Sequence, residues 1–210
     1  MIKFTIVTIT YNAADVFMRT ADSVARQTYA AVEHLIIDGA SSDGTQNMAE
    51  EYKKASDAAC NGHEVRIVSE PDKGLYDAMN KGRRLATGDY VCFLNAGDFF
   101  PSADTLDVIA ANARIEECSS EGKPLPGVLY GDTDWVDNDG NYMSRRRLTP
   151  PEKLTWRSFR HGMLVCHQAF YARTDLAQKV PYDLRYRFSA DVDWCIRIMK
   201  EAEKESLPLV

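Results

Sequence analysis

The sequence predicts an α/β fold with a Rossmann-like, mostly parallel sheet flanked by helices. Apolar runs alternate with helix-like segments through residues 1–100, and this alternation is typical of parallel strands joined by right-handed crossovers. Lys3–Thr10 is a nearly continuous β-branched run, which favours a strand buried on both faces. The alternation stops after Asp98, so we expect a smaller antiparallel part in residues 101–210.

The elements of the first half follow from spacing and from turn residues. Val16, Thr20 and Val24 recur at helical spacing, which predicts a helix over Asp15–Gln27. Gly74 marks the start of the third expected helix, at Leu75. The remaining expected elements are strands at Val32–Asp38, Val65–Ser69 and Tyr90–Leu94, and helices at Thr45–Ala59 and Leu75–Ala86.

The second half is expected to be less regular. Asp137–Gly140 has the composition of a tight turn, which predicts a hairpin between the segments on either side of it. We find no repeat and no linker in the sequence, and therefore expect one domain over residues 1–210. The other expected elements are the hairpin strands Thr133–Val136 and Asn141–Arg147, helices at Ala103–Glu117 and Asp191–Ser206, a polar loop at Ser119–Pro124, and strands at Gly127–Asp132 and Val165–Ala172.

Composition narrows the class of protein. Hydrophobic content of 45% and charged content of 27% are ordinary for a soluble globular chain. The net charge of -6 argues against a nucleic-acid binder, and Arg145–Arg147 is the one basic cluster. Five widely spaced cysteines without zinc-ligand spacing favour reduced thiols in the cytoplasm, with Cys92 and Cys166 buried.

The two ends of the chain carry expectations of their own. A strand follows Met1 directly and no apolar run approaches the ~18 residues of a membrane span, so we expect neither signal peptide nor transmembrane helix. Leu207–Val210 has the composition of the start of a strand. Either the natural protein continues beyond this point, or the segment pairs at a sheet edge.

Two acidic turns follow apolar runs in the first half. Asp38 ends one run and Asp98 lies just beyond another. In open α/β sheets ligands bind at the carboxyl ends of the strands. No glycine-rich phosphate loop is present, so the two acids indicate a nucleotide held by its base and by a metal on its diphosphate.

Four motifs stand out along the chain: Val7–Asn12, the Asp38 turn, Ser69–Gly82 and Ala86–Tyr90. In order and spacing they resemble the family 2 glycosyltransferases, inverting enzymes of the GT-A fold that act in bacterial polysaccharide biosynthesis. The resemblance implies a nucleotide-sugar-binding half at residues 1–100 and an acceptor-side half at 101–210. It also implies a nucleotide-diphosphate sugar donor, a glycan or lipid-linked acceptor, and at most peripheral contact with the inner membrane face.

The base of the nucleotide is assigned to two residues. Asp38 can accept a hydrogen bond from N3–H of uracil or thymine, which favours UDP or dTDP, and Tyr11 can stack on the ring. The family match adds their neighbours Thr10 and Asn12 to the donor site. The alternatives are that Asp38 only caps a turn and that Tyr11 belongs to the core.

Asp98 is the candidate metal ligand, for Mg²⁺ or Mn²⁺. Family members usually carry Leu-Asp-X-Asp-Asp here, whereas this chain has Leu94-Asn95-Ala96-Gly97-Asp98 and lacks two of the three acids. We therefore expect weak affinity for free metal, and assign Asn95 to a ribose hydroxyl. The alternative is that Asp98 is a turn residue only.

Three further donor-site candidates surround the start of the helix after Gly74. Asp72 and Lys73 directly precede a helix N-terminus, which favours anions, and both are assigned to the donor site. Lys73 could reach a phosphate or the sugar. Asn80 is included from the same motif, although it could simply cap the local backbone. An exposed loop lysine is the equally weighted alternative for Lys73.

Asp191 is the candidate general base, because it matches the base that the family carries at the start of this helix. Its neighbour Asp193 is expected to be structural, and both could instead cap the helix. His167 and Gln168 match a His-Gln pair of similar family members and are assigned to the acceptor or the diphosphate. A buried histidine with a structural role is the alternative.

The leading hypothesis is a metal-dependent inverting glycosyltransferase. A sugar-phosphate nucleotidyltransferase would need a Gly-rich basic loop after the first strand, where this chain has Thr10-Tyr11-Asn12-Ala13-Ala14. A non-catalytic nucleotide-sugar or glycan binder is favoured by the missing acids at Asn95 and Gly97. The presence of Asp98 and Asp191 argues against it.

Overall fold

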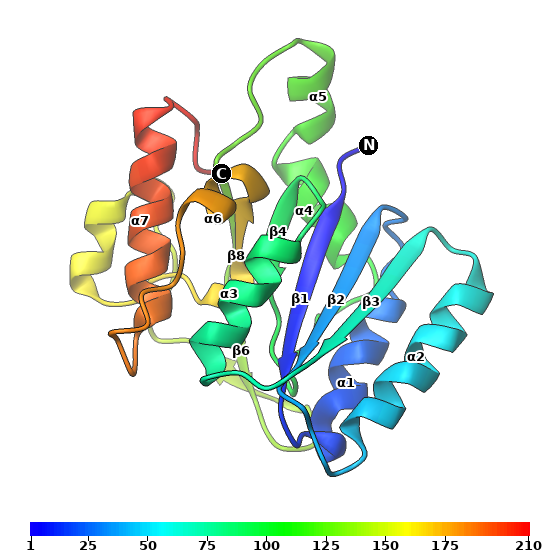
Figure 1. Cartoon of the computed structure of the whole chain (residues 1–210). Helices are drawn as coiled ribbons and strands as arrows, with labels where there is room; N and C mark the ends of the chain where they lie inside the picture. Colours follow the sequence, from blue (N-terminus) through cyan, green and yellow to red (C-terminus); the bar gives the residue numbers. More distant parts are fainter.

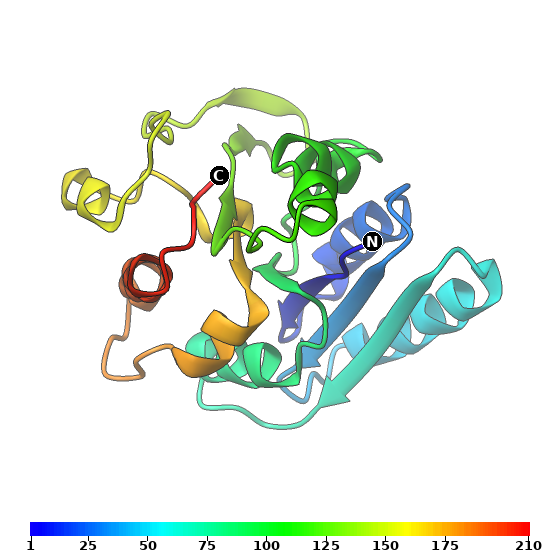
Figure 2. The ribbon, with the colours of Figure 1, turned by 90° about the horizontal axis from the view of Figure 1, so that it is seen from above.

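The computed structural model describes the backbone of all 210 residues and every side chain except those of Glu116, Glu117 and Ser119. Its centre is a six-stranded sheet in the order β3-β2-β1-β4-β8-β5, with helices on both faces (Figure 1, Figure 2). The strands are β1 Phe4–Thr10, β2 Val32–Asp38, β3 His63–Ser69, β4 Tyr90–Phe93, β5 Val128–Tyr130 and β8 Phe170–Arg173.

The first half is the parallel part of the sheet. β1 pairs in parallel with β2 and β4, and β2 pairs in parallel with β3. The strand and helix predictions for this half are confirmed, with ends that differ by at most two residues from those expected. The connecting helices are α1 Ala14–Ala25, α2 Thr45–Ala59 and α3 Leu75–Leu85.

The second half completes the sheet in the opposite direction. β8 is antiparallel to both β4 and β5. The predicted hairpin is confirmed as β6 Asp134–Val136 and β7 Tyr142–Arg145, which form a separate two-stranded sheet. Residues 208–210 run beside β5, with a parallel bridge between Val128 and Leu209.

Two predictions for the second half are wrong in part. The single helix Ala103–Glu117 is two helices, α4 Thr105–Asn112 and α5 Ile115–Ser120, because Arg114 adopts a left-handed backbone conformation between them. The polar loop therefore begins after Ser120, and the side chain of Ser119 lies outside the described residues. The strand Val165–Ala172 begins only at Phe170, since His167–Ala169 forms the 3₁₀ turn η2.

Two short helices were not anticipated, and one long helix was. The unanticipated elements are the 3₁₀ helix η1 Trp156–His161 and the helix α6 Thr174–Lys179. The predicted C-terminal helix is confirmed as α7 Ala190–Lys204. No helix of the described chain is both long and apolar enough to cross a bilayer.

An aromatic cluster holds the N-terminal turn of α7 against the sheet. Trp194 is fully buried and stacks on Tyr182 at 4.8 Å between ring centroids. It also meets the edges of Phe93 and Phe170, on β4 and β8. Burial of large rings contributes about 1.5–3 kcal/mol each, so the start of α7 is fixed relative to the end of β4.

The cysteines described by the structure are free thiols. Cys92 and Cys195 are buried, whereas Cys166, which was expected to be buried, is only half-buried. Cys166 lies in the irregular segment before η2 and not in the expected strand, which accounts for the difference.

Candidate functional site

The candidate site lies where the parallel strands end. Thr10, Asp38 and Ser69 are the last residues of β1, β2 and β3, and they pair in one register across the sheet. The segment after β4 continues along β1, since the amides of Leu94 and Ala96 donate to the carbonyls of Val7 and Ile9. The register therefore brings both acidic turns to one edge, as expected from the sequence.

Asp38 is almost fully buried, with 1% of its surface exposed. Its Oδ1 accepts from Ser41 Oγ at 2.5 Å, and its Oδ2 accepts from Ser41 N–H at 3.0 Å and from Ser69 Oγ at 2.6 Å. The Asx-type turn that was the alternative for Asp38 is thus formed. An ionised carboxylate offers about four lone-pair sites on its two oxygens. Three donors already bind Asp38, so its carboxylate can accept from one further donor.

Tyr11 and Asp72 come together over Gly39. A Cβ atom on Gly39 would lie 2.8 Å from Asp72 Oδ2 and 3.1 Å from Tyr11 Cδ2, so only glycine permits this approach. The Tyr11 side chain is 66% exposed, which excludes the core alternative. It leaves a ring face open beside the Asp38 turn.

The loops after β1 and β2 are tied to each other. Asn12, with a left-handed backbone at φ 47°, donates its N–H to Ser41 Oγ and accepts from Ser42 N–H on Oδ1. Thr10 Oγ1 is buried and has no hydrogen-bond partner among the described residues. The contacts of Asn12 fix the backbone that follows Tyr11.

The donor-site candidates before and within α3 differ in their surroundings. Asp72 Oδ1 accepts from Gly74 N–H at 2.8 Å, and Lys73 is exposed. Asn80 is buried and uses both polar atoms of its amide, donating to Tyr182 O and accepting from Tyr182 N–H and Arg83 Nε. These bonds hold the segment before α7 in place, and the donor-site assignment of Asn80 stays a prediction.

Asp98 lies beside the amides of Asn95 and Gln168. Gln168 Nε2 donates to Asp98 Oδ2 at 3.1 Å, while Gln168 Oε1 and Asn95 Oδ1 are buried without a partner among the described residues. Burial raises the pKa of Asp98 above its ordinary value, although the bond from Gln168 and the proximity of His167 oppose this. A half-buried carboxylate with two unpaired amide oxygens nearby is a donor set that suits a hard divalent cation.

The described residues do not hold a ready-made metal centre. They contain no group of three or more His, Cys, Asp or Glu side chains arranged to bind a metal. A metal at Asp98 would therefore need further ligands from outside these residues.

His167 connects the Asp98 side of the site to Asp191. Its Nε2 lies 3.2 Å from Asn95 Nδ2, and its Nδ1 lies 3.4 Å from Asp191 Oδ2. Asp191 Oδ1 accepts from Tyr76 OH at 3.2 Å. Burial by itself would raise the pKa of Asp191, but the His167 contact, the Val192 N–H and the Tyr76 bond together hold it below its ordinary value.

Consecutive residues of η2 therefore contact the two acids of the site. His167 faces Asp191, and Gln168 faces Asp98. By contrast, Asp193 points away to Arg197, with a 2.6 Å ion pair one helical turn along α7. This agrees with the structural role expected for Asp193.

Three residues at the site were missed by the sequence analysis. Tyr76 lies inside the Ser69–Gly82 motif and could have been singled out there as a donor to the base. Ser41 and Ser69 support Asp38, and their short polar side chains beside an acidic turn were the available signal.

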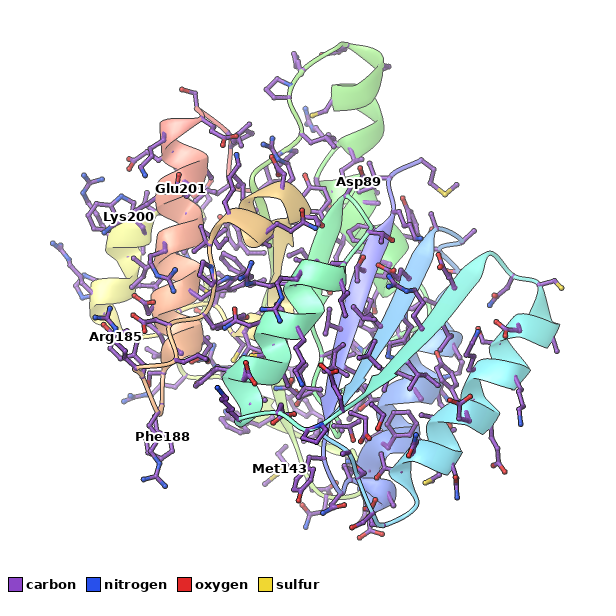
Figure 3. The ribbon with its side chains drawn as sticks, in the orientation of Figure 1. Asp89, Met143, Arg185, Phe188, Lys200 and Glu201 are labelled. Atoms are coloured by element: carbon purple, nitrogen blue, oxygen red, sulfur yellow. The ribbon has the colours of Figure 1, made fainter. Side chains whose placement is uncertain are left out.

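Two exposed apolar side chains lie at the same end of the molecule as the candidate site. Met143 on β7 is 65% exposed, and Phe188, shortly before α7, is 75% exposed. Figure 3 shows both side chains projecting from the end of the molecule at which β1, β2 and β3 finish.

Comparisons with known sequences point to one family. The sequence pattern described as Glycosyl transferase family 2 matches residues 5–179. A PGL/p-HBAD biosynthesis glycosyltransferase of Mycobacterium bovis is 35% identical over 195 residues, covering 92% of this chain and 68% of that protein. The amylovoran biosynthesis glycosyltransferase AmsB of Erwinia amylovora is 30% identical over 205 residues, covering 95% of this chain and 64% of AmsB.

Solved structures agree on the fold. TarS 1-349 of S. aureus, in complex with UDP, superposes with a TM-score of 0.71 at 18% identity, over 94% of this chain and 55% of that one. The mannosyltransferase PcManGT from Pyrobaculum calidifontis, in complex with GDP-Man and Mn²⁺, gives 0.62 at 18% identity, over 100% of this chain and 54% of that one. This chain spans little more than half of either structure, and the match shows the GT-A fold alone.

Proposed function

We propose that this chain, which belongs to glycosyl transferase family 2 and is a glycosyltransferase, transfers one sugar from a nucleotide-diphosphate sugar to a glycan or lipid-linked acceptor with inversion. Relatives named for PGL/p-HBAD and amylovoran biosynthesis support a bacterial glycan or glycolipid product. UDP and GDP-Man in the similar structures support a nucleotide donor. The turn around Asp38 favours UDP or dTDP.

The observation that carries the proposal is the contact of η2 with two separate acids. His167 meets Asp191 at 3.4 Å and Gln168 meets Asp98 at 3.1 Å. Asp98 would then serve the leaving diphosphate and Asp191 the attacking hydroxyl, as displacement at an anomeric carbon requires. The base of the nucleotide would lie on the opposite side of Asp98, between Tyr11 and Asp38.

In this mechanism Asp191 takes the proton of the acceptor hydroxyl as its oxygen attacks the anomeric carbon. The bond from that carbon to the diphosphate oxygen breaks, and the nucleoside diphosphate leaves. Tyr76 and His167 hold the two carboxylate oxygens of Asp191 in position. The low pKa of Asp191 keeps it ionised at neutral pH, so that it is ready to accept the proton.

Mg²⁺ or Mn²⁺, when bound, would neutralise charge on the leaving diphosphate. Asp98 would hold it, and the unpaired oxygens of Asn95 and Gln168 lie in the same part of the site. Lys73 and Asp72 remain candidates for the donor side.

The test is donor binding followed by donor turnover. UDP, dTDP, GDP and CMP are compared by thermal shift with Mn²⁺ present, and the sugar donors of the nucleotide that binds are then assayed for hydrolysis and transfer. Stabilisation by UDP or dTDP with slow donor hydrolysis is expected. Binding without any turnover, with or without added glycan acceptors, would identify a nucleotide-sugar binder instead of an enzyme.

A further inference from the structure

Asn95 offers His167 a hydrogen-bond donor at the position where the run Leu-Asp-X-Asp-Asp has its first acid. Its Nδ2 lies 3.2 Å from His167 Nε2, and its Oδ1 is buried without a partner among the described residues. An amide can donate through its nitrogen, whereas an ionised carboxylate can only accept. The presence of Asn95 instead of an acid therefore changes what the imidazole meets on this side.

The turn that carries Asn95 is fixed from α1. Thr20 is fully buried, and its Oγ1 accepts from Gly97 N–H at 2.9 Å and donates to Asp98 O at 2.7 Å. Asp98 N–H in turn donates to Asn95 O at 2.9 Å. Gly97 has a left-handed backbone at φ 102°, which glycine adopts without strain. The backbone around Asn95 is thus held in place, and a well-ordered turn presents its amide to His167.

The two ring nitrogens of His167 face partners of different kinds. Nδ1 lies 3.4 Å from Asp191 Oδ2. Because an ionised carboxylate has no hydrogen to donate, Nδ1 must bear the proton if the two groups are to attract each other. A neutral imidazole then has a bare lone pair at Nε2. Asn95 Nδ2 lies where a donor to that lone pair is needed.

The other groups around His167 do not supply this donor. His167 lies close enough to Asp98 to oppose the rise in the pKa of that carboxyl, but an ionised Asp98 can only accept. The contact of the Cys92 thiol, at 3.9 Å, is with the backbone carbonyl of His167. Among the described residues, Asn95 is therefore the donor found at Nε2.

We propose that Asn95 is a positioning residue, which holds the neutral imidazole of His167 in the tautomer with its proton on Nδ1, directed at Asp191. The inference rests on the proposed function, since Asp191 is the base of that reaction. No proton passes through Asn95 or His167 in this role; the ring orients the carboxylate and stays uncharged. The amide uses Nδ2 for this contact, so its Oδ1 stays free for the ribose contact expected from the sequence.

The proposal gives a physical reason for the missing acid. A carboxylate at position 95 would accept from Nε2 and favour a proton there. With both nitrogens protonated, the ring would place a positive charge beside Asp191, which stabilises the anion and makes it a weaker proton acceptor. With a proton on Nε2 alone, the lone pair of Nδ1 would face the carboxylate of Asp191 and repel it.

Nitrogen-15 NMR of the histidine-labelled protein, without substrate or metal, reads the tautomer directly, because protonated and bare ring nitrogens resonate at well-separated frequencies. The spectrum is recorded at about pH 8, where an unperturbed imidazole is neutral, and His167→Gln identifies the signals of His167. We expect a proton on Nδ1 and none on Nε2. A proton on Nε2 alone, or on both nitrogens, would overturn the proposal, and this measurement needs no variant at position 95.

Asn95→Asp replaces the donor with an acceptor of nearly the same shape. In this variant Nε2 of His167 should gain a proton. The value of kcat should fall at least roughly tenfold, which is part of the about 10²–10⁴ that a general base contributes. UDP affinity should not fall, because the new carboxylate can still accept from a ribose hydroxyl. Asn47→Asp, on the exposed surface of α2, adds the same charge as a matched control, and neither the His167 signals nor kcat should change.

A double variant separates a role through His167 from a purely structural one. If Asn95 acts through His167, Asn95→Asp should lower kcat much less in the His167→Gln background than in the native one. Equal losses in both backgrounds, or an unchanged proton pattern in Asn95→Asp, would overturn the role of Asn95. Absence of turnover with every nucleotide sugar would instead reject the proposed function, and the NMR spectrum distinguishes the two failures because it needs no turnover.

Discussion

His167 Nδ1 lies 3.4 Å from Asp191 Oδ2, in a pair that is largely shielded from solvent. Tyr76 OH donates to the other oxygen of the same carboxylate. With both oxygens held, Asp191 has little rotational freedom, and the side chain is oriented before an acceptor arrives. This arrangement makes Asp191 and its two partners the first residues to test.

Asp191→Asn should lower kcat by about 10²–10⁴. Asparagine keeps the size of the side chain and can still accept from Tyr76, but it cannot take a proton from the acceptor. Donor affinity should change little, because the base meets the acceptor. The measurement is kcat at saturating donor together with donor affinity from calorimetry.

The matched control is Asp193→Asn, which removes a partly exposed ion pair with Arg197. Pairs of this kind are worth about 0–1 kcal/mol, so a mild effect on stability and almost none on kcat is expected. A greater loss of kcat in Asp193→Asn than in Asp191→Asn would contradict the assignment.

His167→Gln should move the acidic limb of the kcat–pH profile to higher pH. Burial tends to raise the pKa of Asp191, and the His167 contact is the foremost of the interactions that lower it. Without the imidazole the pKa rises, so the ionised base is lost at a higher pH as the solution is acidified. His161→Gln, at an exposed position, should leave the profile unchanged; a shift there, or none in His167→Gln, would count against this positioning role.

Much of the fold follows from the sequence because its signals are local. The β-branched runs of β1 and β2, the Gly74 helix entry and the Asp137–Gly140 turn each predict one element from neighbouring residues. The register of parallel strands then brings Asp38 and Asp98 to one edge. These are the parts of the site that pattern and family resemblance could anticipate.

The remaining part depends on contacts between distant segments. The insertion of β8 between β4 and β5 joins strands far apart in the chain, and no local pattern encodes it. His167 meets Asn95 and Asp191 only because η2 interrupts the expected strand. The buried bonds of Asn80 to Tyr182 are equally non-local, and no local pattern encodes them.

Asp38→Ala should weaken UDP binding by roughly 1.5–3 kcal/mol, as expected for the loss of a hydrogen bond to a charged group. Asp38 also accepts three hydrogen bonds from Ser41 and Ser69, which fix its turn. We therefore expect Tm to fall as well. Calorimetry and thermal unfolding measure the two effects separately.

Ser69→Ala separates the effect on UDP affinity from the effect on Tm, because it breaks one of the same hydrogen bonds and leaves the Asp38 carboxylate in place. A reduced Tm with nearly unchanged UDP affinity is expected for Ser69→Ala. If both variants lose UDP affinity equally, Asp38 acts only through the fold of its turn.

Asp98→Asn should abolish metal-dependent stimulation of donor turnover. With a single acid available, Mn²⁺ should bind detectably only when UDP is present, since the diphosphate supplies the missing ligands. Water-proton relaxation by Mn²⁺, with and without UDP, measures this directly. Tight Mn²⁺ binding to the free protein, or turnover that survives EDTA, would show that Asp98 does not have this role.

The stability of the fold should fall as the pH drops below about 6.5, through His34. This side chain is fully buried. Its Nε2 lies 2.9 Å from Thr8 Oγ1, and its Nδ1 lies 2.8 Å from Tyr52 OH. Burial, helped by the charge of His63, lowers the pKa of His34 from 6.5 to about 3.

The native state therefore keeps His34 neutral while the unfolded chain binds a proton below pH 6.5. The contribution of neutral His34 to the free energy of unfolding is complete above pH 6.5. It declines as the pH falls towards about 3, by at most ~1.4 kcal/mol per pH unit. Urea unfolding at pH 7, 6 and 5 measures the slope. His34→Gln should flatten it between pH 6.5 and 5 and the exposed His161→Gln should not, whereas an unchanged slope in His34→Gln would mean that another group binds the proton.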